Sequence, residues 1–270
     1  MSGCFLDTTI LVHLADPGHA EAAGAAAYVG AHNPADVPYY AYRELLTGLV
    51  RNLCDAYNKL SAAQNVGEAL IAFSNSHPSQ GRKTATGQRA LAEALDGVFK
   101  SNPGGPRAAI STEILDALAL RVSRLWEGAR SQPRVGSVQP LECFNEGSVS
   151  LGRSNELRGP NGSFNCLLSE RCGAAAYIHD NKATLAAMVA ALHPSALTAA
   201  VAAKQETKSR RAALQELQRV GPQKFDKGKC RALGDAYFAA MCPAGSVVAT
   251  SNLDDHQPLC KALGKVAEKP

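Results

Sequence analysis

The apolar and polar positions at both ends of the chain alternate between two periods. Short apolar runs, as around Phe5 and in the β-branched stretch 245–251, are typical of buried strands. Between them, apolar residues recur every three or four positions, which is the spacing of an amphipathic helix. The predicted elements are a strand ending at 5–6, helices over 8–15 and 19–30, a strand over 35–40, helices over 41–60 and 230–242, a strand over 245–251, and a loop leading into a last helix over 254–266. Short strands that alternate with helices indicate an α/β fold with a parallel sheet flanked by helices.

The middle of the chain has a different pattern. Two apolar stripes at helical spacing, separated by the breaker "SNPGGP", are formed by Leu91, Leu95, Val98 and Phe99 and by Ile110, Ile114, Leu118, Val122 and Leu125. Gly, Ser, Asn and Pro then dominate residues 130–166, and helical patterns resume from about 169 to 220. The predicted organisation is an α/β core over 1–65 and 222–270, and a mainly helical insertion over 66–221 with a loop-rich excursion near 130–166.

One uncharged stretch, residues 183–203, is long enough to span a membrane. The sequence His193-Pro194-Ser195 interrupts it, because Pro194 lacks an amide hydrogen and disfavours helix at His193. Two packed soluble helices are therefore predicted, and no membrane association is expected. The eight cysteines form no CxxC pair, and no basic segment followed by an apolar run stands at the N-terminus. These features favour reduced thiols and a cytoplasmic protein.

The composition is that of a folded globular protein. Of the 270 residues, 46% are hydrophobic and 19% are charged, which excludes an intrinsically disordered chain. The net charge of +4 is compatible with a nucleic-acid partner but does not by itself require one.

Acidic residues follow two of the predicted strands, and another lies within the predicted helix 230–242. Asp7 follows the first strand, Asp235 lies in "LGDAYF", and Asn252, Asp254 and Asp255 follow the strand 245–251. Ligands of open α/β folds bind at the carboxyl ends of the strands, so these side chains are candidates for one shared site. Capping of separate helices is the alternative, because aspartate and asparagine are favoured N-caps.

A fourth acidic candidate, Glu44, lies on the predicted helix 41–60. On a helical wheel it stands opposite the apolar face of that helix, with Gly48 one turn further on. A glycine inside a helix costs about 1 kcal/mol relative to alanine, but it clears space for a ligand beside the carboxylate. The alternative is a solvated surface glutamate.

Taken in order, four segments resemble the motifs of the PIN-domain ribonucleases, especially those found as toxins in bacterial toxin–antitoxin pairs. The segments are "FLDTTILVHLAD", "YYAYRELLTGL", "LGDAYFAA" and "VVATSNLDDHQPL". The resemblance covers roughly residues 1–60 and 225–265. The chain differs from the family at Thr9, where asparagine is usual, at His256, where an aromatic residue is usual, and in the long segment between the second and third motifs.

The resemblance implies a PIN-like sheet and metal-dependent endonucleolytic cleavage of RNA. The residues that correspond to the family's metal ligands are Asp7, Glu44, Asp235 and Asp255, with Thr8 and Asn252 as supporting residues. Hard carboxylate oxygens suit Mg²⁺ or Mn²⁺, which lower the pKa of bound water and offset charge on phosphoryl oxygens. Basic residues predicted to hold RNA phosphates beside the site are Arg43, Arg51, Lys227 and Lys229, with a solvated basic surface as the alternative.

The role implied is that of a toxin or defence effector, with RNA as substrate, an antitoxin or other protein partner, and a homodimer by analogy. The alternative is a catalytically inactive PIN-like module that binds RNA or a protein partner. Aspartyl-phosphate phosphatases are a poor match, because Thr9 occupies the position of their second aspartate. The chain also contains no GxxxxGK[ST] phosphate loop and no GxSxG nucleophile turn.

Overall fold

The computed structural model describes residues 3–16, 18–76, 92–98, 100, 107–131, 150–151, 157–158 and 172–270. Their contacts divide the chain into two compact units. Of the described residues, unit 1 contains those up to Tyr42 and those from Cys172 onward. Unit 2 begins at Arg43 and contains the helices up to Ser131 and a short hairpin. Each unit is described separately below.

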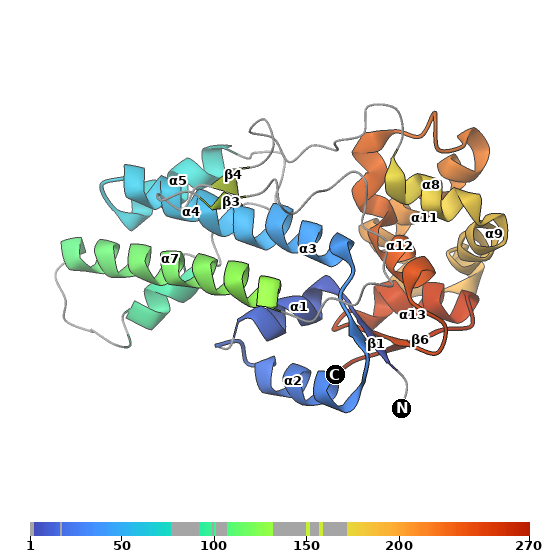
Figure 1. Cartoon of the computed structure of the whole chain (residues 1–270). Helices are drawn as coiled ribbons and strands as arrows, with labels where there is room; N and C mark the ends of the chain where they lie inside the picture. Colours follow the sequence, from blue (N-terminus) through green and yellow to red (C-terminus); the bar gives the residue numbers. More distant parts are fainter. Residues whose placement is uncertain are drawn as a thin grey trace. The chain divides into compact units, whose positions relative to one another are not determined.

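Among the described residues, unit 1 contains a four-stranded, all-parallel sheet in the order β2-β1-β5-β6 (Figure 1). The strands are β1 (Cys4–Leu6), β2 (Ala35–Asp36), β5 (Val247–Ala249) and β6 (Val266–Glu268). Every residue of β1 and β5 is buried, because central strands of a parallel sheet are covered on both faces. The α/β class with a parallel sheet, predicted from the alternating pattern, is thereby confirmed.

The helices of unit 1 precede, connect and cover these strands (Figure 1). They are α1 (Thr8–Ala15), α2 (Ala22–Ala31), the start of α3 (Tyr39–Leu45), α8 (Gly173–Asp180), α9 (Lys182–Ala191), η4 (Pro194–Ala196), α10 (Ala199–Ala203), α11 (Gln205–Val220), η5 (Lys227–Leu233), α12 (Gly234–Met241) and α13 (Leu253–Ala262). Helix α12 packs against α13 and α8, while α13 packs against β6 and α9. The C-terminal sheet and the helices 173–220 therefore share one core.

The uncharged stretch 183–203 is broken where the proline predicted a break. Helix α9 ends at Ala191, His193 is extended, and the separate helices η4 and α10 follow. Among the helices of the described part of the chain, none combines the length and hydropathy that crossing a bilayer requires.

The C-terminal strand β6 was not predicted, and the loop predicted at the start of 254–266 is wrong. Helix α13 already begins at Leu253, and Gly264, with φ 66°, turns the chain into β6. The polar run "DDHQ" resembles a loop in composition, but acidic residues are stabilised in the first turn of a helix by its dipole. The β6 sequence, VAE, contains no apolar run that would mark it as a strand, and its Val266 is 52% exposed.

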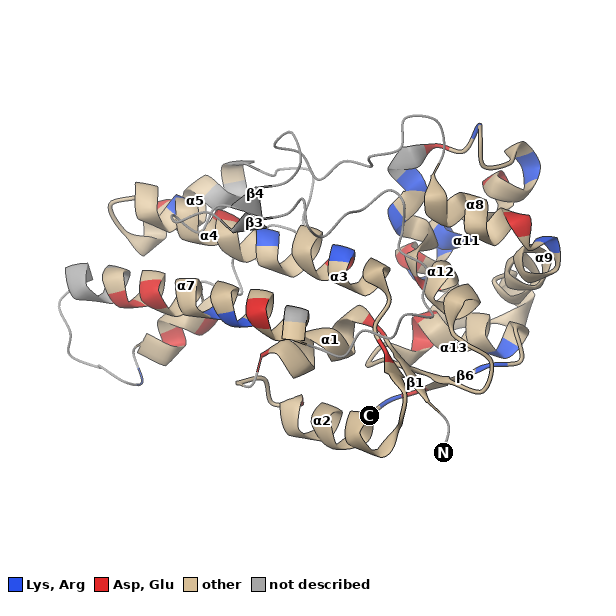
Figure 2. Cartoon of the chain, viewed as in Figure 1, with Lys and Arg blue, Asp and Glu red and all other residues tan. Residues whose placement is uncertain are grey.

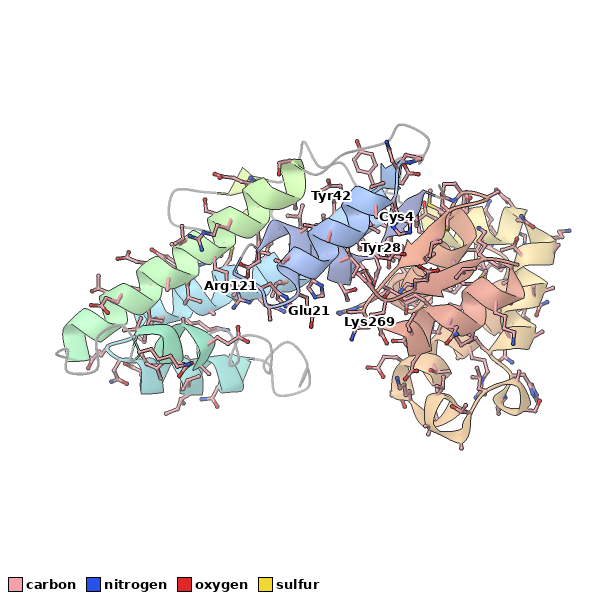
Figure 3. The ribbon with its side chains drawn as sticks, turned by 90° about the horizontal axis from the view of Figure 1, so that it is seen from below. Cys4, Glu21, Tyr28, Tyr42, Arg121 and Lys269 are labelled. Carbon is pink, nitrogen blue, oxygen red and sulfur yellow. The ribbon has the colours of Figure 1, made fainter. Side chains whose placement is uncertain are left out.

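Side chains at this end of the chain connect β6 to the helices. The Lys265 ammonium donates hydrogen bonds to the carbonyls of Ala239, Ala240 and Cys242 at 2.8, 3.0 and 2.7 Å. The first two carbonyls belong to the last turn of α12 and the third to its C-cap, where carbonyls lack an amide partner within the helix. Burial lowers the pKa of Lys265. The last residue of β6, Glu268, accepts at its Oε2 a hydrogen bond of 2.8 Å from the hydroxyl of Tyr28 on α2. Tyr28 is labelled in Figure 3.

Unit 2 is mainly helical. Its elements are the end of α3, η1 (Leu46–Val50), α4 (Arg51–Ala62), α5 (Val66–Ser76), α7 (Arg107–Ser131), and the antiparallel strands β3 (Ser150–Leu151) and β4 (Leu157–Arg158). The predicted helix 41–60 is interrupted by the wider π turn η1, which contains Gly48. The second apolar stripe is confirmed in α7, where Ile114, Leu118, Val122 and Leu125 are buried. Leu91, Phe99 and most of the excursion 130–166 lie outside the described residues.

The contact units differ from the division predicted from the sequence. Residues 43–65, assigned to the core, belong to unit 2, whereas α8 to α11, assigned to the insertion, belong to unit 1. Apolar periodicity shows that a helix buries one face, but it does not show which neighbour covers that face.

We expect Asp36→Asn to remove a pH-dependent destabilisation. Asp36 is buried in β2, its Oδ1 has no hydrogen-bond partner among the described residues, and burial raises its pKa. A carboxyl whose folded pKa is raised contributes stability that is lost as pH rises through that pKa. Urea unfolding at pH 3 and pH 7 should show a gain for Asp36→Asn that is larger at pH 7. The exposed Asp180→Asn controls for the loss of one charge, and an equal gain at both pH values would contradict the prediction.

Candidate acidic site at the carboxyl ends of β1 and β5

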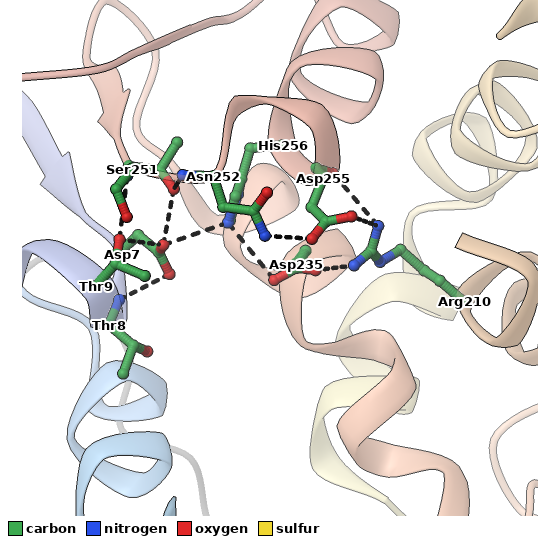
Figure 4. Close-up of polar contacts among 10 residues, drawn as sticks. Asp7, Thr8, Thr9, Arg210, Asp235, Ser251, Asn252, Asp255 and His256 are labelled. Atoms are coloured by element: carbon green, nitrogen blue, oxygen red, sulfur yellow. Dashed lines mark hydrogen bonds and ion pairs between the residues drawn. The ribbon is translucent and has the colours of Figure 1, made fainter. Parts of the chain in front are cut away.

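Asp7 lies at the point where the two central strands of unit 1 end. Its amide donates to Ala249 O at 3.0 Å, which continues the β1–β5 ladder. The carboxylate caps α1, since Oδ1 accepts from the Thr8 amide at 2.7 Å. Oδ2 accepts from the hydroxyls of Thr9 and Thr250 at 2.9 and 2.8 Å (Figure 4). Capping and site formation, which the sequence left as alternatives, are therefore combined in one residue.

The environment of Asp7 keeps it ionised although it is only 4% exposed. Burial alone would raise its pKa, but the nearby His256 ring and the hydroxyls of Thr250 and Thr9 outweigh burial and hold the pKa of this carboxyl below its usual value. Asp7 therefore presents a negative charge at neutral pH.

His256 joins Asp7 to the second acid, Asp235. The His256 Nε2 atom lies 3.6 Å from Asp7 Oδ2 and 3.5 Å from Asp235 Oδ1, and the ring is 1% exposed (Figure 4). Asp235 is the second residue of α12, where the positive end of the helix dipole favours a carboxylate. The N-cap of α12 is Leu233, so Asp235 is not a cap.

The third acid, Asp255, is held from two sides. The Asn252 amide donates to Asp255 Oδ2, and the Arg210 guanidinium lies 3.5 Å from Asp255 Oδ1 through its Nη1 (Figure 4). The Nη2 atom of Arg210 forms an ion pair with Asp235 Oδ2, so one arginine contacts two acids. Asn252 makes no side-chain capping bond to α13 and instead orients Asp255. Figure 2 shows basic residues on α11 and acidic residues on α12 and α13, three helices that belong to unit 1.

Five of the predicted site residues are thus brought into one hydrogen-bonded and ion-paired network, namely Asp7, Thr8, Asp235, Asn252 and Asp255. Thr8 contributes through its backbone amide. The hydroxyls that donate to the Asp7 carboxylate are those of Thr9 and Thr250.

The remaining predicted residues are placed differently. Glu44 and Arg43, both half-buried, and the exposed Arg51 belong to unit 2, so their share in the site stays a prediction. Lys229 forms an ion pair with Glu216 of α11, and the Lys227 side chain lies outside the described part of the chain.

Sequence reasoning missed Arg210 and Thr250. Arg210 interrupts the buried face of α11, whose other members are Thr207, Ala213, Leu214 and Leu217. A charged residue in the middle of an apolar stripe needs a buried partner, and that was the available signal. Thr250 is the first residue after β5, just as Asp7 is the first residue after β1, and this shared position was the available signal for Thr250.

The chemistry of these acids suits a hard divalent cation, but their present arrangement does not form a cage for one. Carboxylate oxygens are the ligands that Mg²⁺ and Mn²⁺ prefer. Among the described residues, however, no group of three or more His, Cys, Asp or Glu side chains is placed to hold a metal ion. The carboxylates instead contact Arg210 and His256. Metal binding would require some of these contacts to open.

A small cavity adjoins the acidic network. Its volume is about 150 Å³, and its lining includes His13, Glu21, Ser251 and Lys269, of which Glu21 and Lys269 are labelled in Figure 3. The Ser251 amide donates to the Thr9 hydroxyl at 3.1 Å. Ser251 of the cavity wall is therefore hydrogen-bonded to Thr9, which itself donates to Asp7.

Comparison of the chain with protein-family models, with curated proteins and with solved structures finds no match.

Proposed function

We propose that this protein is a metal-dependent endoribonuclease with a PIN-like core. The observation that carries the proposal is the convergence of Asp7, Asp235 and Asp255, which lie far apart in the sequence, beside the carboxyl ends of β1 and β5. Residues that merely cap separate helices have no reason to meet. Open α/β folds bind their ligands at this edge of the sheet. The four-motif resemblance supplies the reaction, hydrolysis of RNA phosphodiester bonds.

The proposed ligands of Mg²⁺ or Mn²⁺ are Asp7, Asp235 and Asp255, with Glu44 as a fourth acid. When bound, such an ion lowers the pKa of a coordinated water and offsets charge on phosphoryl oxygens. The chain's own residues fix the acids. The hydroxyls of Thr9 and Thr250 orient Asp7, and the Asn252 amide orients Asp255. Arg43, Arg51, Lys227 and Lys229 are the proposed phosphate-binding residues.

The proposal is tested with purified protein in chelator-treated buffer and an end-labelled RNA of mixed sequence. We expect internal cleavage products when Mn²⁺ or Mg²⁺ is added and none when EDTA is in excess. Cleavage that is unaffected by EDTA would refute the metal-dependent mechanism, and intact RNA with either ion would refute the enzyme.

A second candidate is a catalytically inactive PIN-like module that binds RNA or a protein partner. The ion pairs of Arg210 with Asp235 and Asp255 favour it, because they neutralise acids that a nuclease needs for its metal. Such a module would retard labelled RNA in a native gel, or capture a partner, while leaving the RNA intact with Mn²⁺ present.

For the cellular role we propose a toxin or defence effector, with an antitoxin or other protein as partner and a homodimer as the assembly. Induced expression in bacteria should slow growth for the wild type and not for a variant that lacks cleavage. Light scattering of the purified protein measures the assembly state.

A further inference from the structure

The Arg210 guanidinium contacts two acids of the proposed site, Asp235 and Asp255. It projects from the buried face of α11 and is 5% exposed. Its Nη2 pairs with Asp235 Oδ2, and its Nη1 lies 3.5 Å from Asp255 Oδ1 and 3.4 Å from Asp255 O. The guanidinium therefore contacts oxygens of both Asp235 and Asp255, which the proposed function assigns as ligands of the divalent cation.

A buried guanidinium is stable only while it is paired, and its removal would leave the buried Asp255 and the partly buried Asp235 without their cation. Arginine suits a position between two carboxylates because its planar guanidinium group can donate hydrogen bonds to two acceptors at once. A neighbouring pair, Lys204 with Asp254 at 2.7 Å, is exposed on both sides and has none of this dependence. Asp235 and Asp255 thus need a cation between them, and in the described geometry that cation is Arg210.

We propose that Arg210 is an internal competitor of the divalent cation. Its guanidinium and the ion bind the Asp235–Asp255 pair in turn, so that metal binding releases Arg210 and loss of metal restores the ion pairs. The inference rests on the proposed nuclease function and adds a mechanism of self-inhibition. It also gives a physical reason why three acids can be packed together without a bound ion: the resident guanidinium offsets their repulsion.

The test compares Mn²⁺ binding by the wild type and by Arg210→Met, measured by isothermal titration calorimetry. Because a resident competitor raises the apparent dissociation constant by the factor by which it depopulates the open site, the dissociation constant for Mn²⁺ should fall about tenfold or more in Arg210→Met. Lys204→Met removes the same charge from the exposed pair. Its dissociation constant should stay within about twofold of the wild type, since exposed charges are screened.

Thermal unfolding gives a second measurement. Arg210→Met should melt below the wild type in EDTA, because the buried Asp255 and the partly buried Asp235 lose their partner, and Mn²⁺ should raise its melting temperature more than that of the wild type. Arg210→Lys, which keeps the charge but loses the fork, should be intermediate in both measurements. If Arg210→Met does not fold, crystals of the wild type grown with Mn²⁺ decide: Arg210 should have left both carboxylates.

The outcomes separate the two proposals. Equal Mn²⁺ affinity of the wild type and Arg210→Met, or an ion bound to Asp235 and Asp255 with Arg210 still on both, overturns the competition and leaves the nuclease standing. No Mn²⁺ binding by either protein, together with intact RNA, overturns both.

Discussion

Asp7→Asn is expected to lower Mn²⁺-dependent RNA cleavage by about 100-fold or more, because a catalytic ion contributes several kcal/mol and each ~1.4 kcal/mol is a factor of ten. Asparagine keeps the shape of the side chain and an oxygen that can accept from the Thr8 amide. What it removes is the charge, which the surroundings of Asp7 maintain by lowering its pKa. The rate of cleavage of an internally labelled RNA, at equal protein concentration, measures the effect.

The matched control is Asp16→Asn at the other end of the same helix. Asp16 is also a buried aspartate, but it stands at the C-cap of α1, where its Oδ1 accepts from the Gly18 amide at 3.3 Å. Its replacement should change cleavage little. Equal cleavage by wild type and Asp7→Asn, in preparations with the same melting temperature, would show that the acidic site is not the catalytic site.

The parts of the site that follow strands were predictable from the sequence. Asp7 and Asp255 were found because each follows an apolar run short enough to be a central strand, and parallel strands end at the same edge of a sheet. Asp235 was a weaker candidate, since nothing in its local pattern distinguishes a site residue from a helix cap, and the resemblance of "LGDAYF" to a family motif strengthened it. Local pattern and topology thus located the edge of the sheet, and the resemblance supported the third acid.

The basic half of the network was not predictable in the same way. Arg210 comes from α11, inside the stretch 66–221 that the sequence assigned to an insertion. The helical periodicity of α11 is visible in the sequence. The surface that α11 packs against, however, depends on how α8, α9 and α11 are folded onto α12 and η5. His256 was noticed only as a departure from the family, whereas it bridges two of the acids. Both residues act through contacts between distant segments, which no local pattern encodes.

The guanidinium of Arg210 changes how the acids are interpreted. Three carboxylates in a partly buried site repel one another, and a protein that must exist before it meets a metal ion needs another source of positive charge. Arg210 of α11 supplies it to Asp235 and Asp255, while the His256 ring of α13 contacts Asp7 and Asp235. The same contacts that favour an inactive module therefore also describe the metal-free state of an enzyme, and only metal-binding and cleavage measurements distinguish the two.

Phe238→Ala is expected to cause the largest loss of stability, about 3–5 kcal/mol, as for other buried phenylalanines replaced by alanine. Phe238 lies one turn after Asp235 on α12, and its ring meets the edges or faces of Phe5, Tyr40 and His256 at centroid distances of 5.9, 5.7 and 5.9 Å. The removal of the Phe238 ring opens a cavity beside His256, whose ring contacts Asp7 and Asp235. The loss is measured by urea unfolding followed by circular dichroism.

The control for Phe238→Ala is another aromatic pair of the same unit. Tyr177 is 39% exposed and its ring lies 5.3 Å from that of Tyr237, so Tyr177→Ala should cost about 1 kcal/mol, the usual value of an aromatic pair. Phe238→Leu, which refills most of the space, should fall between the two. A loss for Phe238→Ala no greater than that for Tyr177→Ala would mean that the acids are held by their ion pairs and hydrogen bonds alone. A large loss would mean that the packing of α12 against β1 and α13 determines where Asp235 and His256 stand.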